Sequence, residues 1–316
     1  MPRLLISKTS AFGDIAQTFY VLQDIARARP DLEIICCVDE RFKELIELHP
    51  AVAKVVSLPT RRWRNGAFKL SSWLELVRWI TKLRNLKIDI ALDLQGMYKS
   101  GFVCWVSGAP VRIGRARGNF VEGVSHLFCN KKYEFPRSSR LAEVPRRFTG
   151  QALGYDPTAL TMVSGLHGWR SGEHVGIILG ASKSEKTWPL ENWKKLITKI
   201  SENSKLIPVL DWGTEAERLA ALEVAKSVEG VELHKERKGP QELVKFFNNC
   251  RFILGVDTGP THLAVASGAP VVMLFGLTSP QEYSHPALEN LSTIGSTHGW
   301  PTVDEVFNFL RNRNFI

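Results

Sequence analysis

The chain has 316 residues, of which 44% are hydrophobic and 23% are charged. This composition is typical of a soluble globular protein, and the length allows two domains that each bury a core. No apolar run approaches the ~18 residues that a membrane-spanning helix requires. The segment Met1–Lys8 lacks the apolar length of a signal peptide and instead favours a first strand.

The net charge of +9 is carried by one half of the chain. Residues 1–165 contain 25 Lys and Arg against 15 Asp and Glu, whereas residues 166–316 contain 16 against 17. This asymmetry indicates an anionic partner for the N-terminal half. Nucleic acid, an anionic membrane surface and an acidic small-molecule acceptor would each fit. The five cysteines form no C-x-x-C pair and their number is odd, which argues against a disulfide framework and favours a reduced cytosolic compartment.

Apolar runs of strand length alternate with amphipathic runs of helix length in both halves. In the first half we expect strands at Arg3–Ser7, Glu33–Val38, Val52–Leu58, Ile88–Leu94 and Val111–Gly114. The helices between them are expected at Asp14–Arg29, Arg41–His49, Trp73–Leu86 and Ser100–Val106. In the second half we expect strands at His174–Leu179, Leu206–Asp211, Val231–Leu233, Phe252–Val256 and Val271–Phe275. Its helices are expected at Leu190–Ser201, Glu215–Val228, Pro240–Asn248, from Pro260 onward, and at Val303–Arg313.

The alternation predicts an α/β protein with parallel sheets and right-handed crossovers. We expect two Rossmann-like domains, residues 1–165 and 166–316, with their sheets facing a central cleft. The last helix could pack back on the first domain. Ligands of such sheets bind beyond the carboxyl ends of the strands, which selects four loops: Lys8–Asp14, Asp93–Lys99, Gly180–Trp188 and Asp257–His262.

Several common active-site patterns are missing from these loops. The first strand is not followed by G-x-G-x-x-G, which argues against a dinucleotide redox enzyme, and no P-loop motif is present. There is no Asp-x-Asp pair and no His/Cys cluster at ligand spacing. The sequence therefore gives a metal-dependent mechanism no obvious site.

The turn after Val256 predicts an anion site. Glycine at 259 allows a ligand to approach the backbone, and a helix that opens at Pro260 points its positive end there. The candidate donors are the backbone amides of Thr258, Gly259, Thr261 and His262. The alternative is an ordinary helix cap, with Asp257 capping and His262 in the core.

Two further loops carry candidate chemical groups. Asp14 falls at the start of a helix, where it could accept a proton from a hydroxyl or simply cap the helix. Lys186 could deliver a compact charge to a phosphate, although a solvated loop lysine is the alternative. Trp188 beside it is expected to be a packing residue.

Polar residues on the remaining loops could contact substrates. Arg61, Arg62 and Arg64 surround a tryptophan on an expected loop and could hold carboxylates or phosphates, unless the run is only a solvated basic loop. Gln95 and Lys99 could contact an acceptor. Glu215 or Glu217 could accept hydrogen bonds from a ribose, although both also suit the first turn of a helix.

Five motifs in this order resemble the bacterial heptosyltransferases of glycosyltransferase family 9. They are Lys8-Thr9-Ser10 with Gly13-Asp14, Asp93-x-Gln95-Gly96 with Lys99-Ser100, Lys186-x-Trp188-Pro189, Trp212-Gly213, and Val256-Asp257-Thr258-Gly259 with His262. The resemblance implies the GT-B fold and an inverting transfer that needs neither a metal nor another cofactor. The donor would be ADP-heptose, and the acceptor a 3-deoxy-manno-octulosonic acid (Kdo) residue of the lipid A inner core. The implied setting is the cytoplasm, peripheral to the anionic inner-membrane surface, with no nucleic-acid partner.

The same resemblance assigns roles to individual residues. Asp14 would be the base, and Lys186 would act with the turn at Asp257, Thr258, Gly259, Thr261 and His262 to hold the diphosphate. Other donor contacts would come from Ser10, Gly13, Ser182 and Glu215. Acceptor contacts would come from Arg61, Arg62, Arg64, Gln95, Lys99 and Arg117. The chain departs from the family pattern at Ala11, Asn65 and Pro260.

Three alternatives remain at this stage. A related family member with a different core acceptor, such as heptosyltransferase II, would have no need for the arginines at 61–64. A basic nucleic-acid-binding protein on a Rossmann-like scaffold would use the same charge, but the sequence shows no recognition module. A non-catalytic binder of nucleotide sugars would not depend on Asp14.

Overall fold

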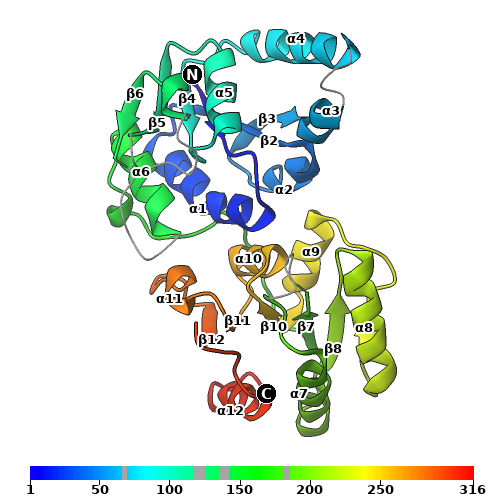
Figure 1. Cartoon of the computed structure of the whole chain (residues 1–316). Coiled ribbons are helices and arrows are strands. Elements are labelled where there is room, and N and C mark those ends of the chain that lie inside the picture. The colour runs from blue at the N-terminus through cyan, green and yellow to red at the C-terminus, as the bar shows by residue number, and fades with distance from the viewer. Residues whose placement is uncertain (66–69, 117–124, 135–141, 181–185) are drawn as a thin grey trace. The chain divides into compact units, whose positions relative to one another are not determined.

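The computed structural model describes residues 1–65, 70–116, 125–134, 142–180 and 186–316. The chain divides into two compact units, Met1–Gly165 and Leu166–Ile316 (Figure 1). Each unit contains a six-stranded sheet in which every neighbouring pair of strands is parallel. The α/β fold class predicted from the sequence is confirmed.

The first sheet has the order β3-β2-β1-β4-β5-β6. Its strands are β1 (Arg3–Ser7), β2 (Glu33–Asp39), β3 (Val52–Leu58), β4 (Ile90–Asp93), β5 (Val111–Arg115) and β6 (Lys131–Tyr133). The central strand β1 is buried from its second residue onward, as expected for a parallel strand covered on both faces.

The second sheet has the order β12-β11-β10-β7-β8-β9. Its strands are β7 (His174–Ile178), β8 (Ile207–Asp211), β9 (Glu232–Leu233), β10 (Cys250–Val256), β11 (Val271–Phe275) and β12 (Leu291–Gly295). When the strands of each unit are counted from its own first strand, both sheets follow the Rossmann order 3-2-1-4-5-6. The strand order reverses between β1 and β4 in the first unit and between β7 and β10 in the second. These two switch points are where such sheets bind ligands.

Helices of the first unit connect its strands and cover the sheet. They are α1 (Phe12–Ala28), α2 (Lys43–Ile46), α3 (Thr60–Asn65), α4 (Leu70–Arg84), α5 (Tyr98–Val106) and α6 (Glu143–Leu153). Short 3₁₀ turns occur at Glu40–Phe42, Ser125–Phe128 and Pro157–Ala159. Trp79 and Leu83 of α4 and Val103 of α5 share a buried core with Leu5 of β1 and Ile35 of β2. On α1, the buried ion pair between Asp24 and Arg146 joins the helix to α6, with 2.5 Å between Arg146 Nε and Asp24 Oδ2.

The second unit is built in the same way. Its helices are α7 (Leu190–Asn203), α8 (Glu215–Ser227), α9 (Pro240–Phe247), α10 (Gly259–Ala266), α11 (Pro280–Tyr283) and α12 (Val303–Asn312). Val306, Phe307 and Leu310 of α12 belong to the core that Trp193 of α7 and Phe252 of β10 also share. Helix α12 packs on α7, where its apolar face completes the core of its own unit (Figure 1). The return of this helix to the first domain stays a prediction.

Some elements differ from the sequence prediction. The stretch Thr60–Asn65 was expected to be a loop but forms α3, whose first residue donates a hydrogen bond through Thr60 Oγ1 to Asp39 Oδ2. The edge strands β6 and β12 and the helix α6 were not predicted. Lys131 and Lys132 of β6 are exposed and β12 is only half-buried, so neither strand shows the apolar run that identifies a central strand. All five cysteines are buried and carry free thiols.

Candidate active site

The loop after β1 places Asp14 on the first turn of α1. Asp14 Oδ2 accepts a hydrogen bond from the backbone N–H of Ala11 at 3.2 Å and lies 3.3 Å from Lys8 Nζ. The Asp14 side chain is nevertheless 53% exposed. Asp14 therefore caps its helix and stays open to a ligand, so the two interpretations of this residue are compatible.

Lys8 is the partner of Asp14. It belongs to the first of the five sequence motifs, but no role was predicted for it from the sequence. Its side chain is only 16% exposed, and burial lowers the pKa of the Lys8 ammonium, although the nearby Asp14 carboxylate opposes that shift. The sequence could have indicated this ion pair, because a lysine and an aspartate flank one strand-to-helix turn. The pair keeps a positive charge beside the candidate base.

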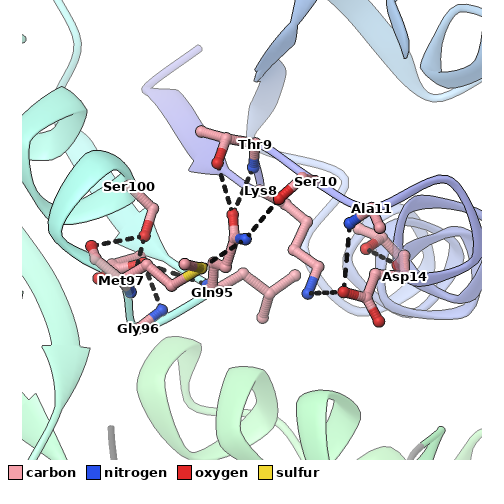
Figure 2. A network of polar contacts seen from close by, with 12 residues as sticks. Lys8, Thr9, Ser10, Ala11, Asp14, Gln95, Gly96, Met97 and Ser100 are labelled. Carbon is pink, nitrogen blue, oxygen red and sulfur yellow. Dashed lines mark hydrogen bonds and ion pairs between the residues drawn. The ribbon is translucent and has the colours of Figure 1, made fainter. Parts of the chain in front are cut away.

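Gln95 connects the loop after β4 to the loop after β1, across the switch point of the first sheet (Figure 2). Its Oε1 accepts hydrogen bonds from both the backbone N–H and the Oγ1 of Thr9, each at 2.7 Å. Its Nε2 donates to Ser10 Oγ at 3.0 Å and approaches Met97 Sδ at 3.0 Å. The residue is 5% exposed. The structure thus uses the Gln95 amide inside the protein, where it fixes the loop that leads to Asp14.

The turn after β4 is held by Asp93. Its Oδ1 accepts from the backbone N–H groups of Gln95 at 3.1 Å and Gly96 at 2.8 Å. Gly96 has a φ of +75°, which favours glycine, and a Cβ there would lie 2.8 Å from the Arg115 side chain and would displace it. Burial lowers the pKa of Arg115 to about 10, opposed by the charges of Asp93 and Asp14. Arg115 therefore adds a partly desolvated cation near this turn.

Asp257 is the centre of a polar cluster at the switch point of the second sheet. Lys186 Nζ, from the segment after β7, lies 2.6 Å from Asp257 Oδ2. His262 Nε2, on α10, lies 3.0 Å from Oδ1, and Thr278 Oγ1 donates to Oδ2 at 3.2 Å. The sequence did not identify Thr278, which follows β11 and is 21 residues away.

The electrostatics of this cluster favour a permanently charged Asp257. Burial alone would raise the pKa of Asp257, but the hydrogen bonds and charges of His262 and Lys186 outweigh it and lower the pKa to about 2. Since a carboxylate can only accept, His262 donates from Nε2 to it. Asp257 therefore orients a cation and an imidazole instead of serving as a simple helix cap.

The start of α10 differs in detail from the predicted anion site. The His262 N–H already donates to the Thr258 carbonyl at 3.1 Å, so this amide is not a free donor. Thr261 is fully buried, and a Cβ at Gly255 would lie only 2.7 Å from its Oγ1, so the residue is turned into the unit. Thr258 and Gly259 are partly exposed. The part of the turn that a ligand can reach is thus narrower than the sequence suggested.

The two glutamates on the first turn of α8 are distinguished by their contacts. Glu215 forms a bidentate pair with Arg218, at 2.7 and 2.8 Å, and is 66% exposed on its side chain. Glu217 Oε2 accepts from the backbone N–H groups of Gly213 and Thr214, each at 2.8 Å. A Cβ at Gly180, just beyond β7, would lie 2.6 Å from Glu217 Oε1. Glu217, and not Glu215, is thus the glutamate beside the switch point.

The basic run lies on a helix. Arg62 Nη2 lies 3.1 Å from both Glu40 Oε2 and Glu75 Oε1. Arg61 and Arg64 are exposed on α3. Arg62 is therefore paired with two acids of its own unit, whereas the resemblance predicted an acceptor contact for each of the three arginines.

The remaining predicted residues are placed as follows. Gly13 is partly exposed on the first turn of α1, and Lys99 is exposed on α5. Ser182 and Arg117 lie outside the described residues. Trp188 is fully buried, donates through Nε1 to the Pro301 carbonyl at 3.0 Å, and packs edge-on against Trp193, which confirms it as a packing residue.

The part of the chain that the structure describes contains no group of three or more His, Cys, Asp or Glu side chains arranged to hold a metal ion. None of its helices combines the length and the apolar character needed to span a membrane.

Comparison with known proteins agrees with this geometry. The family description "Glycosyltransferase family 9 (heptosyltransferase)" matches residues 76–307. Lipopolysaccharide heptosyltransferase 1 of Pseudomonas aeruginosa is 30% identical over 284 residues, which are 88% of this chain and 79% of that protein. The Escherichia coli protein of the same name is 27% identical over 286 residues, 88% of this chain and 89% of that one. The structure of E. coli heptosyltransferase WaaC with ADP has a TM-score of 0.88 at 25% identity, covering 98% of this chain and 99% of that chain.

The chain has two units of Rossmann strand order, each with a polar cluster at its switch point, and its structure is similar to that of WaaC. These features define a glycosyltransferase of the GT-B class. Within that class, the chain belongs to glycosyltransferase family 9, the heptosyltransferases. The family resemblance of the five sequence motifs is thereby confirmed.

Proposed function

We propose that this protein transfers L-glycero-D-manno-heptose from ADP-heptose to a Kdo residue of the lipid A inner core, in lipopolysaccharide core biosynthesis. The observation that carries the proposal is the Lys186–Asp257–His262 cluster at the second switch point, in a chain of this family. A buried carboxylate holds a cation and an imidazole beside a helix start, which is an arrangement suited to a nucleotide diphosphate. The relatives named as lipopolysaccharide heptosyltransferase 1 support the choice of sugar.

The proposed reaction is a single displacement. The acceptor hydroxyl oxygen bonds to the anomeric carbon of heptose while the bond from that carbon to the diphosphate oxygen breaks. ADP leaves with the bonding electron pair, and attack from the opposite face inverts the anomeric centre. Asp14 accepts the hydroxyl proton, a role that its exposed carboxylate can perform.

The charges needed for this reaction come from the chain itself. The leaving diphosphate is a stable anion, so charge stabilisation matters more than a general acid. Lys186 and the exposed part of the turn at Thr258 and Gly259 would supply it without a metal. An oxocarbenium-like transition state reduces the demand on the nucleophile, so a carboxylate such as that of Asp14 is a sufficient base.

We assign the acceptor to the basic first unit. Arg61 and Arg64 are exposed and would face the acidic sugar, with Lys99 as a further cation. Arg62 would instead hold α3 in place through Glu40 and Glu75. Replacing Arg61 and Arg64 together by Ala should raise the acceptor KM by about ten-fold with little change in the donor KM. Equal changes in both constants would contradict the acceptor role.

For the donor nucleoside we propose Glu217 in place of Glu215. Its carboxylate lies beside Gly180, whereas that of Glu215 is paired with Arg218. The reaction would take place on the cytoplasmic face of the inner membrane, where a lipid-anchored acceptor is within reach of a peripheral protein.

The decisive experiment is a transfer assay with ADP-heptose and two acceptors. One acceptor carries only Kdo, and the other already carries one heptose. Product with the first acceptor alone supports the proposal, whereas product with the second alone indicates a related enzyme that acts later on the core. Running both assays with a chelator tests metal independence, since loss of turnover would show that a metal is needed.

A further inference from the structure

Helix α4 carries apolar side chains on two opposite faces. On the inner face, Trp79 and Leu83 are buried in the core of the first unit, and Trp79 Nε1 donates to the Ser57 carbonyl at 2.8 Å. On the outer face, four apolar side chains are 48–75% exposed: Leu70 75%, Trp73 58%, Leu74 48% and Val77 58%. We call these four residues the α4 outer face.

The spacing of the four residues places them together. They occupy positions i, i+3, i+4 and i+7, which form one stripe along an α-helix. Single exposed apolar residues are ordinary on protein surfaces, but a contiguous stripe marks an interaction surface. The inner face anchors α4 to the core of the first unit through Trp79 and Leu83.

Basic residues outnumber acidic ones on α4 and on the neighbouring helix α3. Helices α3 and α4 together contain six Arg and Lys residues and a single acid, Glu75. Glu75 is engaged by Arg62 and by Trp63 Nε1, the latter at 3.2 Å. Arg78 and Lys82 on α4 are exposed. An apolar stripe bordered by cations is the pattern of a helix that lies in the surface of an anionic bilayer.

We propose that the α4 outer face docks the protein on an anionic lipid bilayer, with α4 lying in the plane of the interface. The inference rests on the proposed function, because a lipid-anchored acceptor must be reached at a membrane. Glu75 of α4 contacts Arg62 and Trp63 of α3, so the two helices are linked. Docking through α4 would therefore place Arg61 and Arg64 of α3 at the level of the acidic head groups. In this arrangement the same surface binds the membrane and presents the acceptor-binding arginines.

Charge favours a bilayer over a second copy of the chain. In a symmetric dimer formed through this face, the same patch meets itself, so Arg78 and Lys82 would approach the same cations of the other copy. An anionic bilayer instead attracts each of these charges and strengthens binding roughly five-fold per residue. The apolar stripe adds the insertion energy that a purely basic patch lacks.

The test uses the full chain and sedimentation with vesicles of pure phosphatidylcholine or of phosphatidylcholine with phosphatidylglycerol. The wild type should bind the anionic vesicles and release as salt increases. Leu74→Gln with Val77→Gln should lower the partition coefficient by about ten-fold or more. The matched control is Leu219→Gln, an exposed leucine that is 55% accessible on α8 of the second unit, and it should bind as the wild type does.

A second pair of variants isolates the charge. Arg78→Gln with Lys82→Gln should also reduce binding by about ten-fold or more. Lys195→Gln with Lys226→Gln removes two exposed lysines from the second unit, with the same change in net charge, and should have little effect. Equal losses in both pairs would mean a response to net charge alone and would overturn the role of α4.

Four further outcomes decide the proposal. Absence of wild-type binding to anionic vesicles overturns it, as does an oligomer of the wild type that the α4 variants dissociate in sedimentation velocity. Transfer to an acceptor of the same sugars without acyl chains should be equal in the wild type and the Leu74/Val77 variant, which also shows that the variant is folded. If no acceptor is glycosylated while α4-dependent vesicle binding persists, the proposed function fails and the docking surface stands.

Discussion

Asp14 and Asp257 occupy comparable places in the two units but have opposite surroundings. Each follows a central strand beside the point where the strand order reverses, Asp14 after β1 and Asp257 after β10. The Asp14 side chain is 53% exposed and has Lys8 at 3.3 Å. The Asp257 side chain is 6% exposed and is contacted by Lys186, His262 and Thr278.

This difference shows what each carboxylate can do. An exposed carboxylate can exchange protons with a bound hydroxyl, whereas one whose pKa is lowered to about 2 does not take up a proton near neutral pH. Asp257 instead fixes a cation and an imidazole where an anion can meet them. We therefore propose that the same strand–turn–helix geometry serves chemistry in one unit and binding in the other.

The largest effect is expected at Asp14. Asp14→Ala should lower kcat by about 100-fold or more, because a positioned base contributes on that scale, and should leave ADP affinity unchanged. Steady-state kinetics and calorimetric titration with ADP measure the two quantities. Near-normal turnover would remove Asp14 from the chemistry and leave a nucleotide-sugar binder.

Lys186→Ala should affect the donor instead. We expect kcat/KM for the donor to fall by about 30-fold, with weaker ADP binding, because a cation aimed at the diphosphate is lost. Lys195→Ala, an exposed lysine on α7, is the matched control and should behave as the wild type does. Unchanged ADP affinity in Lys186→Ala would mean that the cluster is purely structural.

The free energy of unfolding should depend on pH through Asp257 of the second unit. The pKa of Asp257 is depressed in the folded state, so its stabilisation is present above the unfolded value near ~4 and is lost as the pH falls through about 2. In urea unfolding, the difference in stability between the wild type and Asp257→Asn should therefore shrink by about 2 kcal/mol from pH ~5 to pH ~2. Parallel curves across this range would show that Lys186 and His262 do not stabilise the ionised form.

A smaller effect is expected at Gln95. Gln95→Leu removes the hydrogen bonds to Thr9 and Ser10 that fix the loop before Asp14, so kcat should fall by about ten-fold with little change in ADP affinity. Gln95→Glu retains an acceptor for Thr9 and should recover part of the activity. A rise in acceptor KM alone, with kcat preserved, would instead support the direct acceptor contact predicted from the sequence.

Sequence patterns predicted those features that depend on neighbours along the chain. The apolar run Phe252–Val256 predicted a buried strand, and the following turn and proline predicted the start of α10. The five ordered motifs indicated the family, which is confirmed. Trp188 was predicted to be a packing residue, and its place in the buried core of the second unit confirms this.

Other features could not be predicted from the sequence because the residues that contact each other are far apart along the chain. Gln95 is 86 residues from Thr9, and Lys186 is 71 residues from Asp257. The burial of Thr261 and the ion pairs of Arg62 depend on which surfaces the fold covers. No local pattern separates a lysine that points to solvent from one that is held by a buried carboxylate.

Local sequence patterns were sufficient to predict the alternation of strands and helices, the excess of positive charge in residues 1–165, and the residue types at the strand ends. These follow from periodicity, composition and short-range turn chemistry, which act over a few residues. The tertiary structure alone decided that Asp14 stays exposed while Asp257 is buried, and that α4 keeps an apolar face outward. Exposure and pairing are set by contacts between segments that the parallel sheets bring together from far apart in the chain.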